Sequence, residues 1–425
     1  MRSTSSRDNR GIRKSGAGSV HFGGGGEVSA GRPDYAIWLM AFLLTCIGII
    51  MVFSASGNFS YRRLADSTYF LKREVLWTLI ALFVMAVAAV CDYRYYRKIA
   101  WLLLATSFVM LILVFVPKIG VEIKGARRWL HLGFLDVHTG EVAKLALVIF
   151  FAVYLSEIKE KIRQWKYFLI GVGVLALFGL VILSQPDFGM MMLLFAIVMT
   201  MMLVAGARLL HLGTLFLGLI PLAIIAIHKA PYRMHRILGF VNPDADPQGS
   251  GFQILQSQIA IVSGGLFGQG LGMSRQKRFF LPEQYTDFIF SVFVEESGFI
   301  GMIFLIAVFI YLGYRGVNIA LKSEDRLGMY LAFGITFSIF FQAFVNMGVA
   351  VGLLPITGLT LPFVSFGGSS LTVTYVGIGI LLNISVRNNA KRKKRAPDDP
   401  AGGGWNGRAH IPSRCGWGAG ARTFS

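Results

Sequence analysis

The chain has 425 residues, of which 55% are hydrophobic and only 15% charged, and its formal net charge is +19 at pH 7. This composition excludes an ordinary soluble domain, because apolar runs near 20 residues recur and such runs suit helices that cross a ~30 Å hydrocarbon core. The positive charge fits basic residues that flank membrane helices better than it fits nucleic-acid binding. Three scattered cysteines indicate neither a disulfide framework nor a metal site.

About ten candidate membrane spans follow a basic N-terminal segment. They lie near residues 35–56, 75–91, 99–117, 139–155, 167–183, 188–205, 209–228, 287–314, 327–350 and 369–386. The sequence therefore predicts an all-α polytopic membrane protein, with its helical domain at 35–386 and a large extracytoplasmic loop, 229–286, between helices 7 and 8. An even number of spans places both termini on one side, and their basic residues make that side the cytoplasm.

Both ends of the chain predict disordered cytoplasmic tails. Residues 1–34 are rich in Gly and Ser, and no apolar segment with a small-residue cleavage site occurs there, so we expect no cleaved signal peptide. Residues 387–425 begin with RNNAKRKKR and continue as a Gly- and Arg-rich segment without periodicity. Such a composition buries too little apolar surface to fold by itself.

The long loop at 229–286 contains one segment with helical periodicity. Its apolar residues recur three or four positions apart, at Phe252, Leu255, Ile259 and Val262. This spacing predicts an amphipathic helix that lies at the membrane interface. A long structured loop in a compact protein is more often functional than idle, so the whole connection is a candidate for function.

Basic residues gather in the predicted outer loops, against the usual bias toward the cytoplasmic side. The sequence GARRW carries two of them and YRMHR carries two more, and the loop before the eighth span adds a lysine: Arg127, Arg128, Arg233, Arg236 and Lys277. Guanidinium groups match phosphate oxygens, so these residues predict an anionic ligand at the outer surface. Contact with lipid headgroups is the simpler alternative for each pair.

The stretch LPEQYTDFIFSVFVEESG, residues 281–298, keeps four acids in an apolar setting. Asp287 stands where the eighth span begins, and there it is either a carboxylate that stabilises a helix N-terminus or a functional acid. Glu295 and Glu296 lie deeper in the span. We expect both to pair with a basic residue of another span.

Three further features have simple structural interpretations. Glu141 and Lys144, three residues apart at the start of the fourth span, predict a neutralised pair. Asp187 in SQPDFG predicts a cap for the sixth span. The Pro- and Gly-broken segment GLLPITGLTLPFVSFGGSS, residues 352–370, predicts a re-entrant segment packed inside protein. No Walker loop, HEXXH, CXXC or nucleophile elbow occurs, so nothing implies ATP use or a covalent serine mechanism.

Taken in order, these motifs resemble the SEDS family, which comprises FtsW, RodA and SpoVE. The resemblance covers about residues 35–390 and rests on VFSAS, GARRW, SQPDFG, YRMHRILGFVNPDADPQGSG, TDFIF and GLTLPFVSFGGSS. The sequence of the last motif, GLTLPFVSFGGSS, is most like the corresponding motif of the FtsW and SpoVE branch. The resemblance implies a peptidoglycan glycosyltransferase of the bacterial cytoplasmic membrane, acting at the division septum. It implies lipid II as substrate, a class B penicillin-binding protein as partner, and contacts with other divisome or elongasome membrane proteins.

The resemblance also implies roles for particular residues. Asp287 matches the essential acid of the family and is the expected catalytic residue. The candidate substrate-binding residues are Arg127, Arg128, Glu141, Lys144, Asp187, Arg233, Arg236, Gln256, Ser257 and Lys277. The chain departs from the family pattern at three places. His138, Thr139 and Gly140 replace a usual Gln-Pro-Ser, Tyr285 replaces a His, and Phe366 replaces a Tyr, which puts in doubt the detailed shape near Glu141.

The mechanism that this resemblance implies is inverting glycosyl transfer, with Asp287 as the general base that deprotonates the acceptor hydroxyl. No cofactor is required by the sequence. A divalent cation, Mg²⁺ or Mn²⁺, would suit a diphosphate leaving group, although the sequence contains no recognisable cluster of metal ligands. Two other functions stay open: a lipid II flippase with Glu141, Lys144, Glu295 and Glu296 along its path, and a non-catalytic division scaffold. A role in division, elongation or sporulation is also open.

Overall fold

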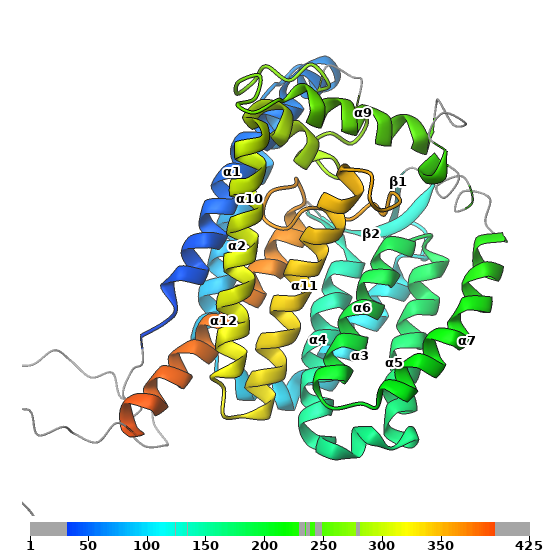
Figure 1. Ribbon diagram of the computed structural model, residues 1–425, viewed down its shortest axis with the longest axis vertical. Helices are drawn as coiled ribbons and strands as arrows, with labels where there is room; N and C mark the ends of the chain where they lie inside the picture. The colour runs from blue at the N-terminus through cyan, green and yellow to red at the C-terminus, as the bar shows by residue number, and fades with distance from the viewer. Residues whose placement is uncertain are drawn as a thin grey trace, which may run out of the picture.

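The structure is a computed structural model, and it describes residues 32–123, 125–133, 135–228, 234, 239–242, 249–277 and 281–395. Within these residues the protein is a bundle of long helices with a helix across one end (Figure 1). Most of both predicted tails lies outside the described residues, and so do Arg233 and Arg236.

Each of the predicted spans corresponds to a helix. The helices are α1 (Tyr35–Leu64), α2 (Tyr69–Val90), α3 (Tyr96–Leu113), α4 (Thr139–Ile158), α5 (Trp165–Ser184), α6 (Phe188–Val204), α7 (Leu209–His228), α10 (Ile289–Leu321), α11 (Arg326–Ala350) and α12 (Gly368–Arg395). In the described part of the chain, 7 helices are long and apolar enough to cross a membrane by length and composition. The prediction of a polytopic helical fold is confirmed.

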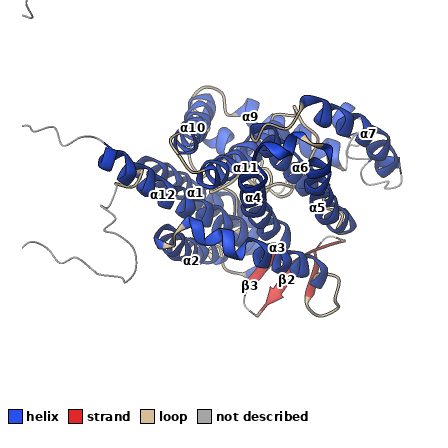
Figure 2. Ribbon diagram, turned by 90° about the horizontal axis from the view of Figure 1, so that it is seen from below, coloured by secondary structure: helices blue, strands red, loops and turns tan. Residues whose placement is uncertain are grey.

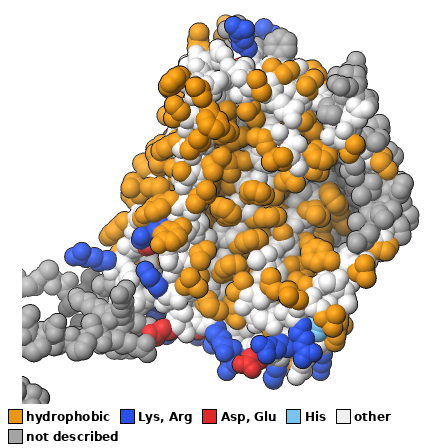
Figure 3. All heavy atoms as spheres, viewed as in Figure 1, with side chains coloured by type: hydrophobic (Ala, Val, Ile, Leu, Met, Phe, Trp, Pro, Cys, Tyr) orange, Lys and Arg blue, Asp and Glu red, His pale blue; other side chains and the backbone are white. Residues whose placement is uncertain are grey.

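The surface of the bundle matches such a fold. Figure 3 shows hydrophobic side chains covering the middle of one face, while Lys and Arg gather toward its ends. A belt of this kind suits contact with lipid, because charged side chains are costly in the hydrocarbon core and favourable at its edges.

A small antiparallel sheet occupies the predicted loop 118–138, and the sequence analysis missed it. Its strands β1 (Gly120–Ile123), β2 (Ala126–Leu132) and β3 (Leu135–His138) pair in the order β1-β2-β3. Gly125 and Gly133, with φ of 76° and 70°, stand at the two turns, a backbone conformation that glycine adopts without a steric cost. The strands lie at the edge of the bundle beside α3 (Figure 2).

The core of the bundle is α4, which packs against α3, α6, α11 and α12. It is buried on nearly every side from Thr139 to Ser156. A helix that is buried all round can carry charged residues only where they are paired, so Glu141 and Lys144 need partners inside the protein.

The predicted amphipathic helix is present as α9 (Ser250–Ser263), which lies across the end of the bundle (Figure 1). Its buried residues include Ile254 and Ser257, and it packs against α10 and α11. Leu255, Ile259 and Val262 are 41%, 42% and 78% exposed. Most of the predicted apolar stripe therefore faces outward, as an interfacial helix requires.

The helix α10 is broken at Gly298, whose φ is 73° and ψ is −172°. The preceding loop fills the break, where the backbone N–H of Gln269 donates to the carbonyl of Glu295 at 2.9 Å. A Cβ on Gly298 would stand 2.3 Å from the backbone nitrogen of Gly268, so only glycine fits there. The first turns of α10 thus form a separate segment, and Asp287 lies directly before it.

The two deep acids of α10 bind the loop before it. The carboxylate of Glu296 pairs with Nζ of Lys277 at 2.9 Å, and both groups contact the hydroxyl of Ser54 on α1. Glu295 accepts a hydrogen bond from the hydroxyl of Ser274. The expectation of a basic partner in another span is wrong for both, because the Glu296 partner comes from the loop and Glu295 uses a hydroxyl.

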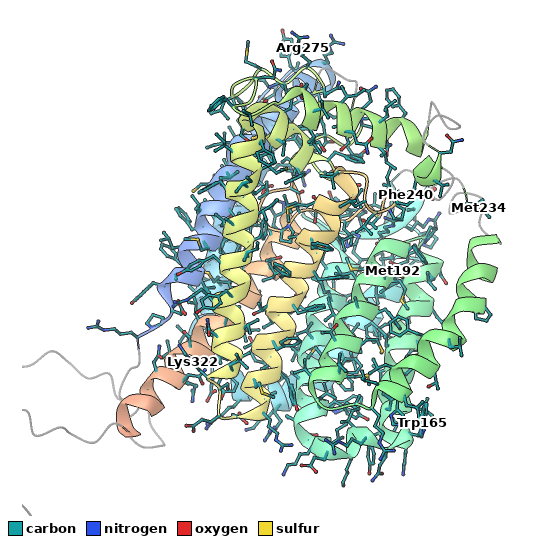
Figure 4. The ribbon with its side chains drawn as sticks, viewed as in Figure 1. Trp165, Met192, Met234, Phe240, Arg275 and Lys322 are labelled. Atoms are coloured by element: carbon teal, nitrogen blue, oxygen red, sulfur yellow. The ribbon has the colours of Figure 1, made fainter. Side chains whose placement is uncertain are left out.

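The Lys277–Glu296 pair predicts a large loss of stability when one partner is removed. Both side chains are buried, so Lys277→Met leaves an uncompensated carboxylate, at a cost of about 3–5 kcal/mol. We expect the melting temperature of the purified protein in detergent to fall. Lys322→Met, at an exposed site at the opposite end of the bundle, is the control (Figure 4, where Arg275 marks the Lys277 end).

The double variant Lys277→Met with Glu296→Gln separates pairing from packing. It removes the uncompensated charge and should recover part of the lost melting temperature. A Lys277→Met protein that melts with the wild type would show that the pair does not hold the loop on α10.

Candidate active site

A cavity of about 480 Å³ opens at the α9 end of the bundle. Its walls come from α2, β2, β3, the first turns of α4 and α6, α9, the segment 281–288 and the loop between α11 and α12. Four of the residues predicted from the sequence line it: Asp287, Arg128, Glu141 and Asp187. The fold therefore brings together residues that are up to 159 positions apart in the chain.

Asp287 is half-buried, and its backbone is fixed from two sides. The side-chain amide of Asn346 donates to the Asp287 carbonyl at 2.8 Å and to the Leu359 carbonyl at 2.7 Å. The hydroxyl of Ser365 donates to the carbonyl of Thr286 at 2.6 Å. These bonds tie the segment before α10 to α11 and to the loop after it, so the carboxylate has a defined direction.

Gly358 separates Asp287 from Arg128. A Cβ on Gly358, where φ is 77°, would stand 3.8 Å from Oδ2 of Asp287 and 4.0 Å from Nη1 of Arg128. The carboxylate and the guanidinium group therefore face the same small space. A base and a cation so arranged can act on a hydroxyl and on a neighbouring anion.

Asp187 joins the sheet to α6. Its Oδ1 accepts the backbone N–H of Met190 at 3.1 Å, which confirms the predicted cap. Its Oδ2 lies 3.7 Å from Nε of Arg128 and 3.6 Å from Nε2 of His138. Burial alone would raise the pKa of the Asp187 carboxyl, but the neighbouring ring of His138 and the charge of Arg128 lower it below the ordinary value. The group is therefore a carboxylate at neutral pH.

The two arginines of GARRW do not act together. They are neighbours on the strand β2 where its pairing with β1 is irregular: Val121 pairs with Trp129 and Glu122 with Arg127, so Arg128 is the extra residue of a bulge. Arg128 lines the cavity, whereas Arg127 is half-exposed and its Nε binds Glu122 at 3.0 Å. Arg127 does not line this cavity, and its contact with the ligand stays a prediction.

Glu141 and Lys144 form the predicted pair. Nζ of Lys144 lies 2.5 Å from Oε2 of Glu141 and 2.6 Å from Oε1 of Gln342 on α11. The amide of Gln342 in turn donates to the carbonyl of Thr360 at 3.0 Å. Glu141 lines the cavity, whereas Lys144 does not. The charge of the lysine therefore affects the cavity by neutralising Glu141.

Three other candidates lie away from the cavity lining. The hydroxyl of Ser257 is fully buried and lies 2.6 Å from both Ser291 Oγ and the carbonyl of Ala350, so its role is to fix α9. Lys277 is held by Glu296. Gln256 is half-buried outside the lining, and Gln253, about one turn earlier on α9, lines the cavity instead.

The sequence analysis missed several lining residues. Besides Gln253 they are Arg73, Asp136, His138 and Glu283. The charged groups of Arg73 and Asp136 lie 3.6 Å apart. Arg73 could have been found from the sequence as a basic residue at the start of a span. His138 was visible only as a departure from the family pattern.

The two other departures meet on one wall of the cavity. The rings of Tyr285 and Phe366 lie 4.8 and 5.1 Å from the ring of Phe70, measured between centroids. All three side chains line the cavity. The changes at 285 and 366 therefore build one aromatic surface, and such a surface suits the apolar face of a sugar ring.

The fold and the cavity define a polytopic helical membrane protein with a charge-lined site at one end of its bundle. Residues 34–390 match the FtsW/RodA/SpoVE family, described as cell cycle protein, and the chain belongs to this family. It is 43% identical over 360 residues to the probable peptidoglycan glycosyltransferase FtsW of Geobacter metallireducens, covering 84% of this chain and 95% of the relative. It is 42% identical to the stage V sporulation protein E of Bacillus subtilis, covering 83% and 97%.

Solved structures agree with the family. A structure that describes how a peptidoglycan synthase complex coordinates polymerization and crosslinking matches with a TM-score of 0.69 and 28% identity, over 83% of this chain and 97% of that one. The rod shape determining protein RodA of Thermus thermophilus matches with a TM-score of 0.62 and 29% identity, over 83% and 96%.

Proposed function

We propose that the chain polymerises lipid II into β-1,4-linked glycan strands at the outer face of the cytoplasmic membrane, with Asp287 as general base. Relatives named probable peptidoglycan glycosyltransferase FtsW, at 41% to 43% identity over most of both chains, support the glycosyltransferase activity. One observation carries the assignment of the site: the Asp287 carboxylate and the Arg128 guanidinium face one space in a single cavity.

The proposed step is a single displacement. Asp287 takes the proton from the 4-hydroxyl of the acceptor GlcNAc, and that oxygen attacks the anomeric carbon of the donor MurNAc. The bond from this carbon to the diphosphate breaks, and the electron pair leaves with undecaprenyl diphosphate. Arg128 stabilises the charge that develops on the diphosphate. An α-linked donor gives a β-linked product, and the step needs one base and no nucleophilic side chain.

The size of the cavity indicates which parts of the substrate it can hold. A volume of about 480 Å³ is typical of a pocket for one small molecule. It suits the diphosphate and the reacting sugars, so the polyprenyl tails would lie along the apolar surfaces of the helices. The aromatic wall of Phe70, Tyr285 and Phe366 would pack against a sugar ring.

The interior of the bundle favours an enzyme over a flippase. Beyond the Glu141–Lys144 pair, the buried residues of α4 from Ala146 to Val153 are all apolar. A flippase needs a polar path for its headgroup through the bundle, and this central helix offers none along that stretch. Polymer formed from lipid II confined to the outer leaflet of vesicles would support the enzyme directly.

The relatives support a proposal for the partner and the location. A peptidoglycan synthase complex is among the similar structures, and we propose a class B penicillin-binding protein as the partner of this chain. We also propose that both termini are cytoplasmic and that the protein works at the division septum, as the name FtsW of its relatives indicates.

Asp287→Asn tests the catalytic assignment. The amide keeps the shape of the side chain but cannot accept the proton, so we expect lipid II polymerisation to fall by about 10²–10⁴-fold. The assay uses purified chain with its transpeptidase partner and measures glycan length on gels. Asp66→Asn, which changes an acid in the turn between α1 and α2, should leave the rate unchanged. Wild-type polymerisation by Asp287→Asn would disprove the assignment, and it is also what the scaffold function predicts.

Arg128→Lys tests the anion contact, with Arg127→Lys as the matched control at the neighbouring position of β2, outside the cavity lining. Lysine keeps the charge but loses the planar fork, so the KM for lipid II should rise about tenfold or more. Arg127→Lys should leave the KM unchanged because Arg127 does not line the cavity. Equal effects of the two changes would contradict the proposed contact between Arg128 and the diphosphate.

A requirement for Mg²⁺ or Mn²⁺ is also part of the proposal. Among the described residues, no group of three or more His, Cys, Asp or Glu is placed to hold a metal ion. Mg²⁺ is often bound by one or two carboxylates and substrate phosphates, so Glu283 with the diphosphate could hold it. There it would neutralise charge on the leaving group.

Removing divalent cations tests this requirement. We expect chelation with EDTA to lower the polymerisation rate and added Mg²⁺ or Mn²⁺ to restore it, in the assay described above. A rate that is insensitive to EDTA would show that the positive side chains suffice.

A further inference from the structure

One buried carboxylate oxygen is shared by two basic side chains at the cavity. Oδ2 of Asp187 lies 3.7 Å from Nε of Arg128 and 3.6 Å from Nε2 of His138. The other oxygen, Oδ1, is used by the backbone N–H of Met190. Because Asp187 is almost fully buried, water screens these charges poorly, and the charge state of each group strongly affects the others.

The position of Arg128 does not depend on Asp187 alone. Its Nε donates to the carbonyl of Gln185 at 3.2 Å, and its Nη2 donates to the carbonyl of Pro186. Nη1 is the nitrogen that faces the space beside Gly358, which Oδ2 of Asp287 also faces. Backbone carbonyls thus fix the guanidinium, and Asp187 decides mainly how much of its charge is cancelled.

His138 is fixed on the opposite side of the same carboxylate. It ends β3, its ring meets the ring of Trp129 edge-on at 4.9 Å, and its backbone N–H donates to Ser369 at 3.2 Å. The charged groups that face it are Asp187, Arg128 and Glu141, and Lys144 neutralises Glu141. The charge of its ring is therefore felt chiefly by Asp187.

We propose that His138 is a positioning residue that acts through Asp187 and sets how much positive charge Arg128 presents to the diphosphate in the cavity. With a neutral imidazole, Asp187 cancels the charge of Arg128. With an imidazolium, His138 and Arg128 share the carboxylate, and a net positive charge faces the anion. The inference rests on the proposed function, because it needs a diphosphate bound beside Arg128.

A proton on the His138 ring adds one positive charge beside Asp187, so lipid II affinity should fall as the pH rises across the measured range, pH 5.5 to 8.5. The diphosphate of lipid II is a diester and does not titrate there. We expect wild-type affinity to weaken about tenfold between pH 6 and pH 8, on the scale of one charge acting over several ångströms at the protein surface. The rate of the bound complex depends on Asp287 and should follow a different profile.

Substitutions of His138 and Asp187 should change the affinity for lipid II in opposite directions. His138→Gln keeps a donor for Asp187 but cannot become charged, so affinity should stay at the weak, high-pH level at every pH. Asp187→Asn keeps the cap, since Asn is a good cap residue, but frees the charge of Arg128. Its affinity should stay at the tight, low-pH level. A purely structural role for the two residues would weaken binding in both.

The experiment measures the dissociation constant of lipid II from pH 5.5 to 8.5 in the Asp287→Asn background, where no turnover occurs, with KM and kcat in the active protein beside it. The control is His211→Gln, because the His211 ring packs against Trp165 and Phe168 at the other end of the bundle (Figure 4) and does not line the cavity. It should keep the wild-type profile. A wild-type profile in His138→Gln, or weaker binding in Asp187→Asn, would overturn the inference. If Asp287→Asn still polymerises lipid II, the proposed function fails instead.

Discussion

Charges that are buried in an apolar bundle must be paired, and this constraint decides how the α9 end of the protein is built. Lys144 binds Glu141 and reaches α11 through Gln342. Lys277 and Glu296 join the long loop to α10 and α1. Arg128 and Asp187 join the sheet to α6. The first two pairs are costly to break, and each fixes segments that the chain places far apart, whereas Arg128 is also held to the start of α6 by the carbonyls of Gln185 and Pro186.

The cavity is what these pairs leave between them. Two of the three pairs contribute lining residues: Glu141 from the first pair, and Arg128 and Asp187 from the last. The third keeps the broken helix α10 against its loop, and the first segment of that helix follows Asp287. The backbone of Asp287 is held by the side-chain amide of Asn346, and Ser365 holds the neighbouring carbonyl of Thr286. A reacting carboxylate on a rigid support is the arrangement that proton transfer requires.

The helices could be predicted from the sequence because lipid imposes a length and an apolar composition on every span. The sheet could not, since strands as short as Gly120–Ile123 carry little periodic signal and depend on the turns at Gly125 and Gly133. Missing the strand had a direct consequence. Arg127 and Arg128 look equivalent in the sequence, and only the structure shows that Arg128, the extra residue of a bulge in β2, lines the cavity while Arg127 does not.

Side-chain partners were predicted well only where they were local. The pair of Glu141 with Lys144 and the cap by Asp187 lie within three residues along the chain. The partners of Glu295 and Glu296, by contrast, come from the loop before α10, and the cavity uses Gln253 rather than Gln256 because of how α9 is rotated. The catalytic assignment of Asp287 came from the family resemblance, because its position alone fitted a helix N-terminal acid equally well.

The most direct measurement is a structure of the protein with lipid II bound in both the donor and the acceptor positions. The account predicts that the donor diphosphate lies against Arg128, and that the acceptor 4-hydroxyl lies within hydrogen-bond distance of the Asp287 carboxylate, about 2.6–3.2 Å. A complex in which the diphosphate lies outside this cavity, or in which another side chain holds the acceptor hydroxyl, would contradict it.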